Sequence, residues 1–172
     1  MSDNSELHIR DARPDEIVAV GELLLKSYEE YAARMPPEAW TGYSDNLRDV
    51  QGRWEEALTI VAELGGSLAG TVTLYLENSY NEAWPKDWAG IRLLGTHPSA
   101  RGKGVGKLLM DECIRRSREY GMTHIGLHTT ILMDTARKMY ERTGFIRTPE
   151  YDFQVGSGVV ISGYVLDLTS SS

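Results

Sequence analysis

Residues 91–106 of this chain, IRLLGTHPSARGKGVG, contain the feature that decides its fold, a glycine-rich turn between a strand and a helix. The apolar run Ile91–Thr96 is typical of a buried strand, and His97-Pro98 ends it. A helical pattern begins near Val105. The turn and the start of the helix hold three glycines and two cations, namely Gly102, Gly104, Gly106, Arg101 and Lys103.

This turn has the composition of an anion-binding loop. Glycine lets the backbone approach a ligand closely and adopt a positive φ. The first turn of the following helix presents unpaired N–H groups and the positive end of the helix dipole. The stretch therefore predicts that a phosphate or pyrophosphate binds here.

The spacing of the glycines excludes two common phosphate loops. The nucleotide P-loop requires Gly, four residues and then Gly-Lys-Ser/Thr, but Arg101 stands at the first glycine position and Leu108 at the hydroxyl position. The dinucleotide fingerprint G-x-G-x-x-G requires a third glycine at Lys107 or Leu109. The pattern that fits is Arg-x-x-Gly-x-Gly, beginning at Arg101.

Residues 91–106 resemble the acetyl-coenzyme A signature of the GNAT (Gcn5-related) N-acetyltransferase family. Residues 136–145, ARKMYERTGF, resemble the closing A-x-x-x-Y-E-x-x-G-F segment of the same family. The two motifs occur in the family's order and at about its separation, and the resemblance is strong over roughly residues 89–147. It implies the GNAT acyl-CoA N-acyltransferase fold, acetyl-CoA as the acyl donor, and transfer to an amine.

The resemblance also implies which residues bind acetyl-CoA. By this resemblance, the strand that contains Leu94–Thr96 would separate from its neighbouring strand. The backbone of these residues would then pair with the pantetheine arm and polarise the thioester carbonyl. Met133 and Ala136 would line the wall beside the pantetheine, although the family often has Asn where Met133 stands. The implied cofactor-binding positions are Leu94, Gly95, Thr96, Arg101, Gly102, Lys103, Gly104, Val105, Gly106, Lys107, Met133, Ala136 and Tyr140.

The catalytic groups are only partly indicated. The tyrosine of the second motif, Tyr140, is the general acid that the resemblance implies for the leaving thiolate. Many relatives carry a glutamate in the first half of the strand before the loop, but residues 90–92 here are Gly-Ile-Arg. Glu77, at the end of the preceding strand, has the best position for a substitute base. The other groups that could take this role are Glu82, Asp87 and His128, or a water ordered by Tyr75 and Tyr80.

Hydrophobic patterning predicts the order β-α-α-β-β-β-α-β-α-β-β. This order indicates an α+β (α/β three-layer) domain with a central mixed, mostly antiparallel sheet flanked by helices, as expected of the GNAT fold. We expect an irregular loop over residues 78–89 and a cap at Asp134 on the second-motif helix. Strands are predicted at 7–10, 58–64, 68–77, 91–96, 125–129, 151–155 and 159–168, and helices at 11–31, in parts of 38–56, at 105–120 and at 134–143.

Composition predicts one ordinary globular domain over residues 1–172, with its core at about 7–168 and flexible ends at 1–6 and 169–172. The chain is 41% hydrophobic and 25% charged, and its formal charge of −7 argues against binding to nucleic acid. No run approaches the ~18 apolar residues of a membrane span, and the polar N-terminus does not resemble a signal peptide. We therefore expect a cytoplasmic protein that does not enter membranes.

The single cysteine, Cys113, excludes an intramolecular disulfide and a cysteine-based zinc site, and no metal is expected. The acceptor site is expected in residues 29–56 and 78–89, which are rich in aromatic residues. A non-catalytic acetyl-CoA sensor of the same fold is the alternative to an enzyme, because the strand before the loop lacks an acid. Relatives in this family are often dimers, so the resemblance allows a homodimer.

Overall fold

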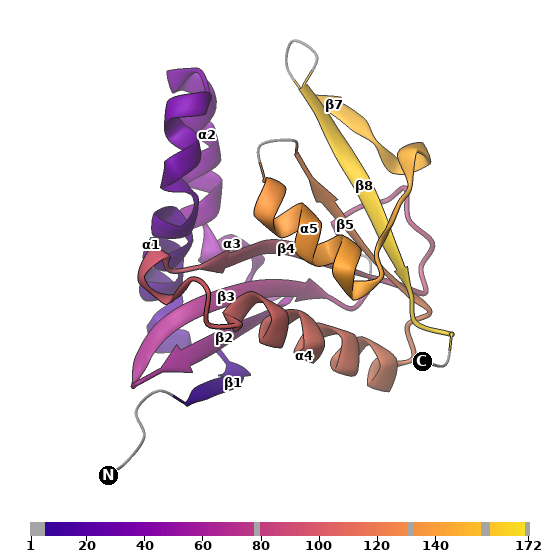
Figure 1. Cartoon of the computed structure of the whole chain (residues 1–172), viewed down its shortest axis with the longest axis horizontal. Helices are drawn as coiled ribbons and strands as arrows, with labels where there is room; N and C mark the ends of the chain where they lie inside the picture. The colour runs from indigo at the N-terminus through magenta and orange to yellow at the C-terminus, as the bar shows by residue number, and fades with distance from the viewer. Residues whose placement is uncertain (1–5, 78–79, 131–132, 156–158, 171–172) are drawn as a thin grey trace. The chain divides into compact units, whose positions relative to one another are not determined.

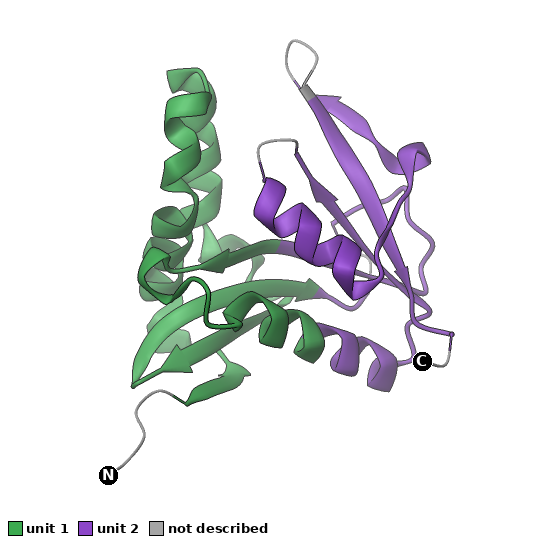
Figure 2. Ribbon diagram, viewed as in Figure 1, with its two compact units in different colours: residues 1–74, 93–112 green, residues 75–92, 113–172 purple. Residues whose placement is uncertain are grey.

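The computed structural model describes residues 6–77, 80–130, 133–155 and 159–170. The chain divides into two compact units (Figure 2). Unit 1 comprises residues 1–74 and 93–112, and unit 2 comprises residues 75–92 and 113–172. The single domain expected over residues 1–172 stays a prediction.

The strands follow the order β1-β2-β3-β4-β5-β8-β6, and β7 pairs with β8 (Figure 1). β4 and β5 are parallel, whereas the β1–β2, β2–β3, β5–β8, β6–β8 and β7–β8 ladders are antiparallel. This mixed, mostly antiparallel sheet is the one that the sequence predicted. The strands are β1 (Leu7–Asp11), β2 (Leu58–Leu64), β3 (Ser67–Tyr75), β4 (Trp88–Thr96), β5 (His124–Thr129), β6 (Ile146–Arg147), β7 (Phe153–Val155) and β8 (Val159–Asp167).

The helices agree with the sequence pattern in position and differ in detail. The predicted first helix is interrupted by tighter turns, because residues 14–16 and 29–34 form 3-10 helices on either side of α1. Pro36-Pro37 separates it from α2, as expected. The α-helices are α1 (Ile17–Tyr28), α2 (Pro37–Arg48), α3 (Val50–Arg53), α4 (Val105–Tyr120) and α5 (Asp134–Thr143).

Unit 1 has a buried core to which α1, β2 and β3 contribute. Val20 and Leu24 recur at helical spacing and are each 1% exposed, as is typical of the apolar face of a helix. From the strands Ile60 and Val72 are fully buried, and from the first half of α4 Leu109 is fully buried too. The N-terminal half of α4 therefore belongs to this core.

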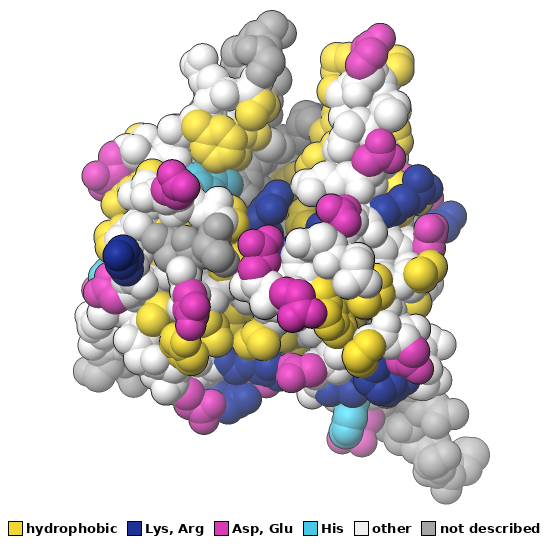
Figure 3. Space-filling model, turned by 180° about the vertical axis from the view of Figure 1, so that it is seen from behind, with side chains coloured by type: hydrophobic (Ala, Val, Ile, Leu, Met, Phe, Trp, Pro, Cys, Tyr) yellow, Lys and Arg dark blue, Asp and Glu magenta, His cyan; other side chains and the backbone are white. Residues whose placement is uncertain are grey.

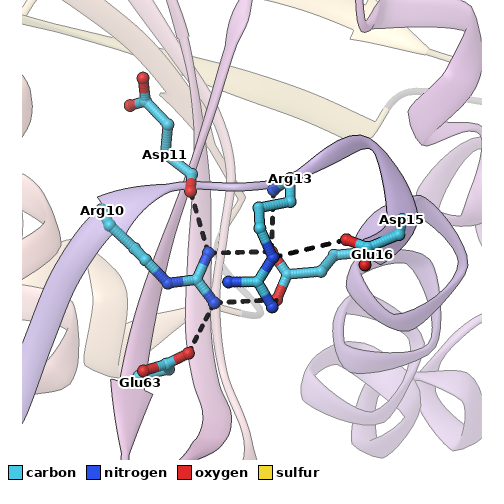
Figure 4. A network of polar contacts seen from close by, with 6 residues as sticks. All are labelled: Arg10, Asp11, Arg13, Asp15, Glu16 and Glu63. Carbon is cyan, nitrogen blue, oxygen red and sulfur yellow. Dashed lines mark hydrogen bonds and ion pairs between the residues drawn. The ribbon is translucent and has the colours of Figure 1, made fainter.

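A polar network ties the start of unit 1 together (Figure 4). The Arg10 guanidinium of β1 donates two hydrogen bonds to the Glu16 carboxylate, at 2.9 and 2.8 Å, and a third to Glu63 of β2 at 2.6 Å. The backbone N–H of Arg13 also donates to Glu16. These bonds, the Arg10 pair above all, lower the pKa of Glu16 to about 2.

Unit 2 is built around the β4–β5–β8 ladders. β4 pairs with β5 at Trp88–His124, Ala89–Ile125 and Gly90–Gly126. Alternate β5 residues, Ile125 and Leu127, are buried. Cys113 of α4 is also fully buried.

Four local predictions were wrong. Residues 88 and 89, expected at the end of the loop 78–89, belong to β4, because they pair with His124 and Ile125 of β5. Asp134 is the first residue of α5 and not its cap, and its carboxylate pairs with Arg137 at 2.7 Å. The segment predicted as a strand at 151–155 begins with the end of a 3-10 helix, residues 149–151. The short strand β6 was not predicted.

Acidic and basic side chains are interspersed on the face shown in Figure 3. The net charge of −7 is therefore not gathered into a single field on that face. Within the described residues, no helix is long and apolar enough to cross a membrane.

Candidate functional site

The predicted anion-binding loop lies in unit 1, between the 3-10 helix at residues 98–100 and α4. Gly102 and Gly104 both have φ of +79°, a conformation that side chains rarely adopt. A Cβ on either residue would meet no atom within 4 Å, and both residues are exposed. The loop is therefore an open turn of backbone that leads directly into the N-terminus of a 16-residue helix.

Two of the three cations among the implied cofactor-binding positions are already engaged. The Arg101 guanidinium donates to the backbone oxygen of Ser27 at 3.0 Å and pairs with Glu30 at 2.7 Å. Lys107 pairs with Asp111, one turn further along α4, at 2.7 Å. Lys103 has no ion pair within the part of the chain that the structure describes. Arg101 thus links the loop to the end of α1 by a hydrogen bond and an ion pair, a role that the sequence did not reveal.

The second half of β4 leads to this loop through a distorted backbone. Leu93 has φ of 57°, the one positive value found for a described residue other than glycine. The next carbonyl, that of Leu94, accepts a hydrogen bond from the Tyr28 hydroxyl of α1. A Cβ on Gly95 would lie 2.9 Å from the Cβ of Ser27. Glycine at 95 therefore allows α1 to approach β4 closely.

The residues of the second motif lie on α5 and after it, in unit 2. Tyr140 is 7% exposed, and its ring centroid lies 5.8 Å from that of Phe145. The N–H of Phe145 donates to the Tyr140 carbonyl, and Gly144, with φ of 116°, ends the helix. Met133 and Ala136 are partly exposed at the start of α5. The motif tyrosine and phenylalanine are thus packed together at the C-terminal turn.

Glu77, the predicted substitute base, is exposed after the end of β3. Its carboxylate accepts a hydrogen bond of 2.7 Å from the Tyr120 hydroxyl, at the last residue of α4. This bond raises the pKa of Tyr120. The carboxylate that the sequence singled out is therefore partnered at the C-terminal end of α4.

The aromatic residues predicted near the acceptor site form two groups. In unit 1, Tyr28 contacts Tyr31 and Tyr43, with ring centroids 6.0 and 5.9 Å apart, and Trp40 lies 6.2 Å from Tyr43. In unit 2, a larger cluster covers one face of the β4–β5 ladder. Its members are Tyr75, Tyr80, Trp84, Trp88, His124, His128, Tyr151 and Phe153.

In the unit 2 cluster, Trp84 stacks on His128 with an interplanar angle of 2° and a centroid separation of 5.3 Å. The His128 Nε2 lies 2.9 Å from the Tyr151 carbonyl oxygen. Burial lowers the pKa of His128 and raises that of Tyr80. Trp84 and His128 are visible in the sequence, but their stacking depends on the tertiary fold.

No group of three or more His, Cys, Asp or Glu side chains among the described residues is arranged to hold a metal ion. The donors in the loop are backbone N–H groups and cations, which suit an anionic ligand.

Comparison with known proteins identifies the family. A model of the acetyltransferase (GNAT) family matches residues 19–145. The mycothiol acetyltransferase of Propionibacterium freudenreichii is 28% identical over 138 residues, which cover 80% of this chain and 41% of that protein. The chain thus spans about two fifths of the length of this curated relative.

Solved structures show the same fold. YncA of Salmonella typhimurium, solved with its cofactor acetyl-CoA, has a TM-score of 0.67 at 17% identity, covering 96% of each chain. The PaiA N-acetyltransferase of Thermoplasma acidophilum, in complex with coenzyme A, has a TM-score of 0.71 at 16% identity, covering 92% of this chain and 98% of its own. These likenesses confirm the predicted fold, and the match over residues 19–145 shows that the chain belongs to the GNAT acetyltransferase family.

Proposed function

We propose that this protein is an N-acetyltransferase that moves the acetyl group of acetyl-CoA to a primary amine by direct attack in a ternary complex. The observation that carries the proposal is the open loop at residues 101–106, where two glycines at φ of +79° lead into α4. Relatives of the same fold are solved with acetyl-CoA or coenzyme A, and the family is one of acetyltransferases.

The donor is held by backbone more than by side chains. N–H groups of the loop and of the first turn of α4 bind the pyrophosphate, because they have no partner within the helix. Lys103 supplies the nearest cation that is not engaged by an acidic side chain of the described residues. The backbone of Leu94–Thr96 pairs with the pantetheine arm, and donors of this kind are worth a few kcal/mol of barrier when they polarise a carbonyl.

The resemblance of the second motif gives residues of α5 roles toward the donor. Met133 and Ala136 line the wall beside the pantetheine. Tyr140 donates its hydroxyl proton to the leaving thiolate, since a tyrosine hydroxyl is both a donor and an acceptor. These roles rest on the match of the second motif.

Glu77 is one candidate for the base that takes the proton of the amine. Its carboxylate accepts the Tyr120 hydroxyl, so it would have to exchange this bond for one to the substrate. Replacing Glu77 by glutamine tests this role directly.

The proposed function is tested by binding and turnover together. Titration calorimetry with acetyl-CoA is expected to show 1:1 binding, and release of free coenzyme A is expected in the presence of at least one class of primary amine. A screen over alkylamines, polyamines, amino acids, aminoglycosides and peptide N-termini would identify that class. Binding without turnover for any amine would favour the sensor, and no binding at millimolar acetyl-CoA would overturn both.

A further inference from the structure

Two aromatic rings cover one face of the β4–β5 ladder in unit 2. Gly90 of β4 and Gly126 of β5 face each other in register. A Cβ on Gly126 would lie 2.6 Å from the Trp84 ring, and one on Gly90 would lie 2.5 Å from the Tyr80 ring. Real Cβ atoms are not found so close to other atoms, so no longer side chain fits at position 90 while these rings stay in place. A carboxylate at position 90 is therefore excluded by packing.

His128, two residues after Gly126 on β5, is held in one tautomer by the same cluster. Its Nε2 lies 2.9 Å from the Tyr151 carbonyl oxygen. A carbonyl can only accept, so Nε2 carries a hydrogen, and in the neutral ring Nδ1 therefore keeps its lone pair. The Tyr80 hydroxyl lies 3.5 Å from that Nδ1. The stacked Trp84 ring and the edge-on Phe153 ring fix the plane of the imidazole.

The charged and titratable groups around this imidazole favour its neutral form at neutral pH. Burial lowers the pKa of His128. From β4, the Arg92 guanidinium lies over the Tyr80 ring, 5.3 Å from its centroid, and its positive charge acts in the same direction. The Tyr151 bond and the Asp152 carboxylate act in the opposite direction, but Asp152 is already paired with Arg147 by two bonds of 2.6 Å.

We infer that His128, acting through the Tyr80 hydroxyl, accepts the proton that the substrate amine loses. The inference rests on the proposed function. In this step the ammonium N–H bond breaks and its proton moves to the Tyr80 oxygen, while the Tyr80 proton moves to the His128 Nδ1. The products are a neutral amine, an unchanged tyrosine and an imidazolium. Tyr80 contacts the substrate, and His128 is the positioning residue behind it.

A base of this kind is needed because an alkylammonium with a pKa near ~10.4 is neutral at pH 7 in only about one molecule in 10³. A positioned base typically contributes about 10²–10⁴-fold. Compared with Glu77, which is exposed and bonded to Tyr120, His128 has an unprotonated nitrogen aimed at a hydroxyl donor.

The pH dependence of the rate separates a base from a structural residue. We would measure kcat/KM with saturating acetyl-CoA and n-butylamine between pH 6 and 10. The wild type is expected to show a plateau between the His128 pKa and the pKa of the amine. His128→Gln keeps an N–H that can donate to the Tyr151 carbonyl but cannot take a proton. Its rate is expected to be about 10²-fold lower at pH 7, to rise about tenfold per pH unit, and to meet that of the wild type near pH 9.

Three further variants complete the kinetic test. His124→Gln is the matched control, because His124 lies on the same strand and stacks on Trp88 at 4.9 Å, and its pH profile is expected to equal that of the wild type. Tyr80→Phe keeps the ring packing and should reproduce the profile of His128→Gln. If His128→Gln lowers the rate equally at every pH, or if Glu77→Gln alone removes the plateau, the inference is overturned.

Nitrogen NMR of the imidazole tests the inference without turnover. The His128 ring is expected to be neutral at pH 7 with its hydrogen on Nε2. A charged ring, or one with the hydrogen on Nδ1, would overturn the inference even in an active enzyme. If His128 shows the expected tautomer but no amine is acetylated, the proposed function fails and the inference falls with it.

Discussion

At the scale of single residues, the hydroxyl of Tyr140 is the group most closely tied to the proposed chemistry. Tyr140→Phe removes that oxygen and keeps the ring packed on Phe145, so the fold should survive. We expect kcat to fall by about 10²-fold, as for loss of a general acid, while the Kd for acetyl-CoA measured by calorimetry stays nearly constant.

Tyr164 provides the matched control, because its hydroxyl also lies in unit 2 but donates to Glu141, at 3.1 Å. Tyr164→Phe should cost about 1 kcal/mol of stability and leave kcat unchanged. Equal kcat values for Tyr140→Phe and the wild type would remove the acid role.

The Arg10–Glu16 pair predicts how stability depends on pH. The pKa of Glu16 is lowered from an ordinary value of 4.5 to about 2, so the folded state binds the proton less readily than the unfolded state. The stabilisation is therefore complete above about pH 4.5 and is lost as the pH falls toward 2. Arg10→Met should cost about 2 kcal/mol near pH 7 and much less near pH 2, measured by urea unfolding at each pH.

Lys26→Met is the control for that measurement, because the Lys26–Glu29 pair is exposed at 3.6 Å. Its removal should change the unfolding free energy by less than about 0.5 kcal/mol at any pH. A constant cost for Arg10→Met between pH 2 and 7 would show that Glu16 is not the group responsible.

At the scale of elements, the glycine loop and the helix that follows it form one binding device. A β-branched residue cannot readily adopt the φ of +79° that Gly104 has. Gly104→Val should therefore change the backbone of the loop and move its N–H groups. We expect acetyl-CoA affinity to fall at least tenfold, and stability to fall by about 1–3 kcal/mol.

Gly121→Val isolates the effect of strain alone. Gly121 has φ of +93° and open space around it, as Gly104 has, but it lies at the other end of α4. It should lose similar stability and keep its acetyl-CoA affinity in calorimetry. If both variants lose affinity equally, the loop is not the site of binding.

The sequence could predict the helices and strands whose ends are set by short-range patterns of residues. Helix α4 was predicted at both ends, because apolar residues recur at helical spacing and Gly121 stops it. Residues 88–90 were missed because a short run containing tryptophan and glycine has no periodicity that separates strand from loop. Two contacts join residues that are far apart in sequence: the ion pair between Arg101 and Glu30, and the hydrogen bond between Tyr28 and Leu94. Such contacts depend on tertiary packing and have no local signal.

At the scale of the whole molecule, the two compact units share continuous elements. The boundary between the units falls within β4, at residues 92–93, and within α4, at residues 112–113. Each unit therefore contains part of β4 and part of α4. A helix or strand loses cooperativity when it is cut, so unfolding either unit should destabilise the other. We therefore expect a single thermal transition.

The tryptophans allow that expectation to be tested together with donor binding. Trp40 and Trp54 lie in unit 1, and Trp84 and Trp88 lie in unit 2. In a Trp40→Phe/Trp54→Phe variant the fluorescence reports unit 2 alone, whereas circular dichroism reports both units. The two midpoints should coincide.

Acetyl-CoA at about 100 times its Kd adds about 2.7 kcal/mol to the free energy of unfolding, which raises the midpoint by about 5–10 °C for a chain of this length. An equal shift of the unit 2 fluorescence and of the circular dichroism is expected if the two units unfold together. Two separate transitions, or a shift seen only by circular dichroism, would show that the units unfold independently.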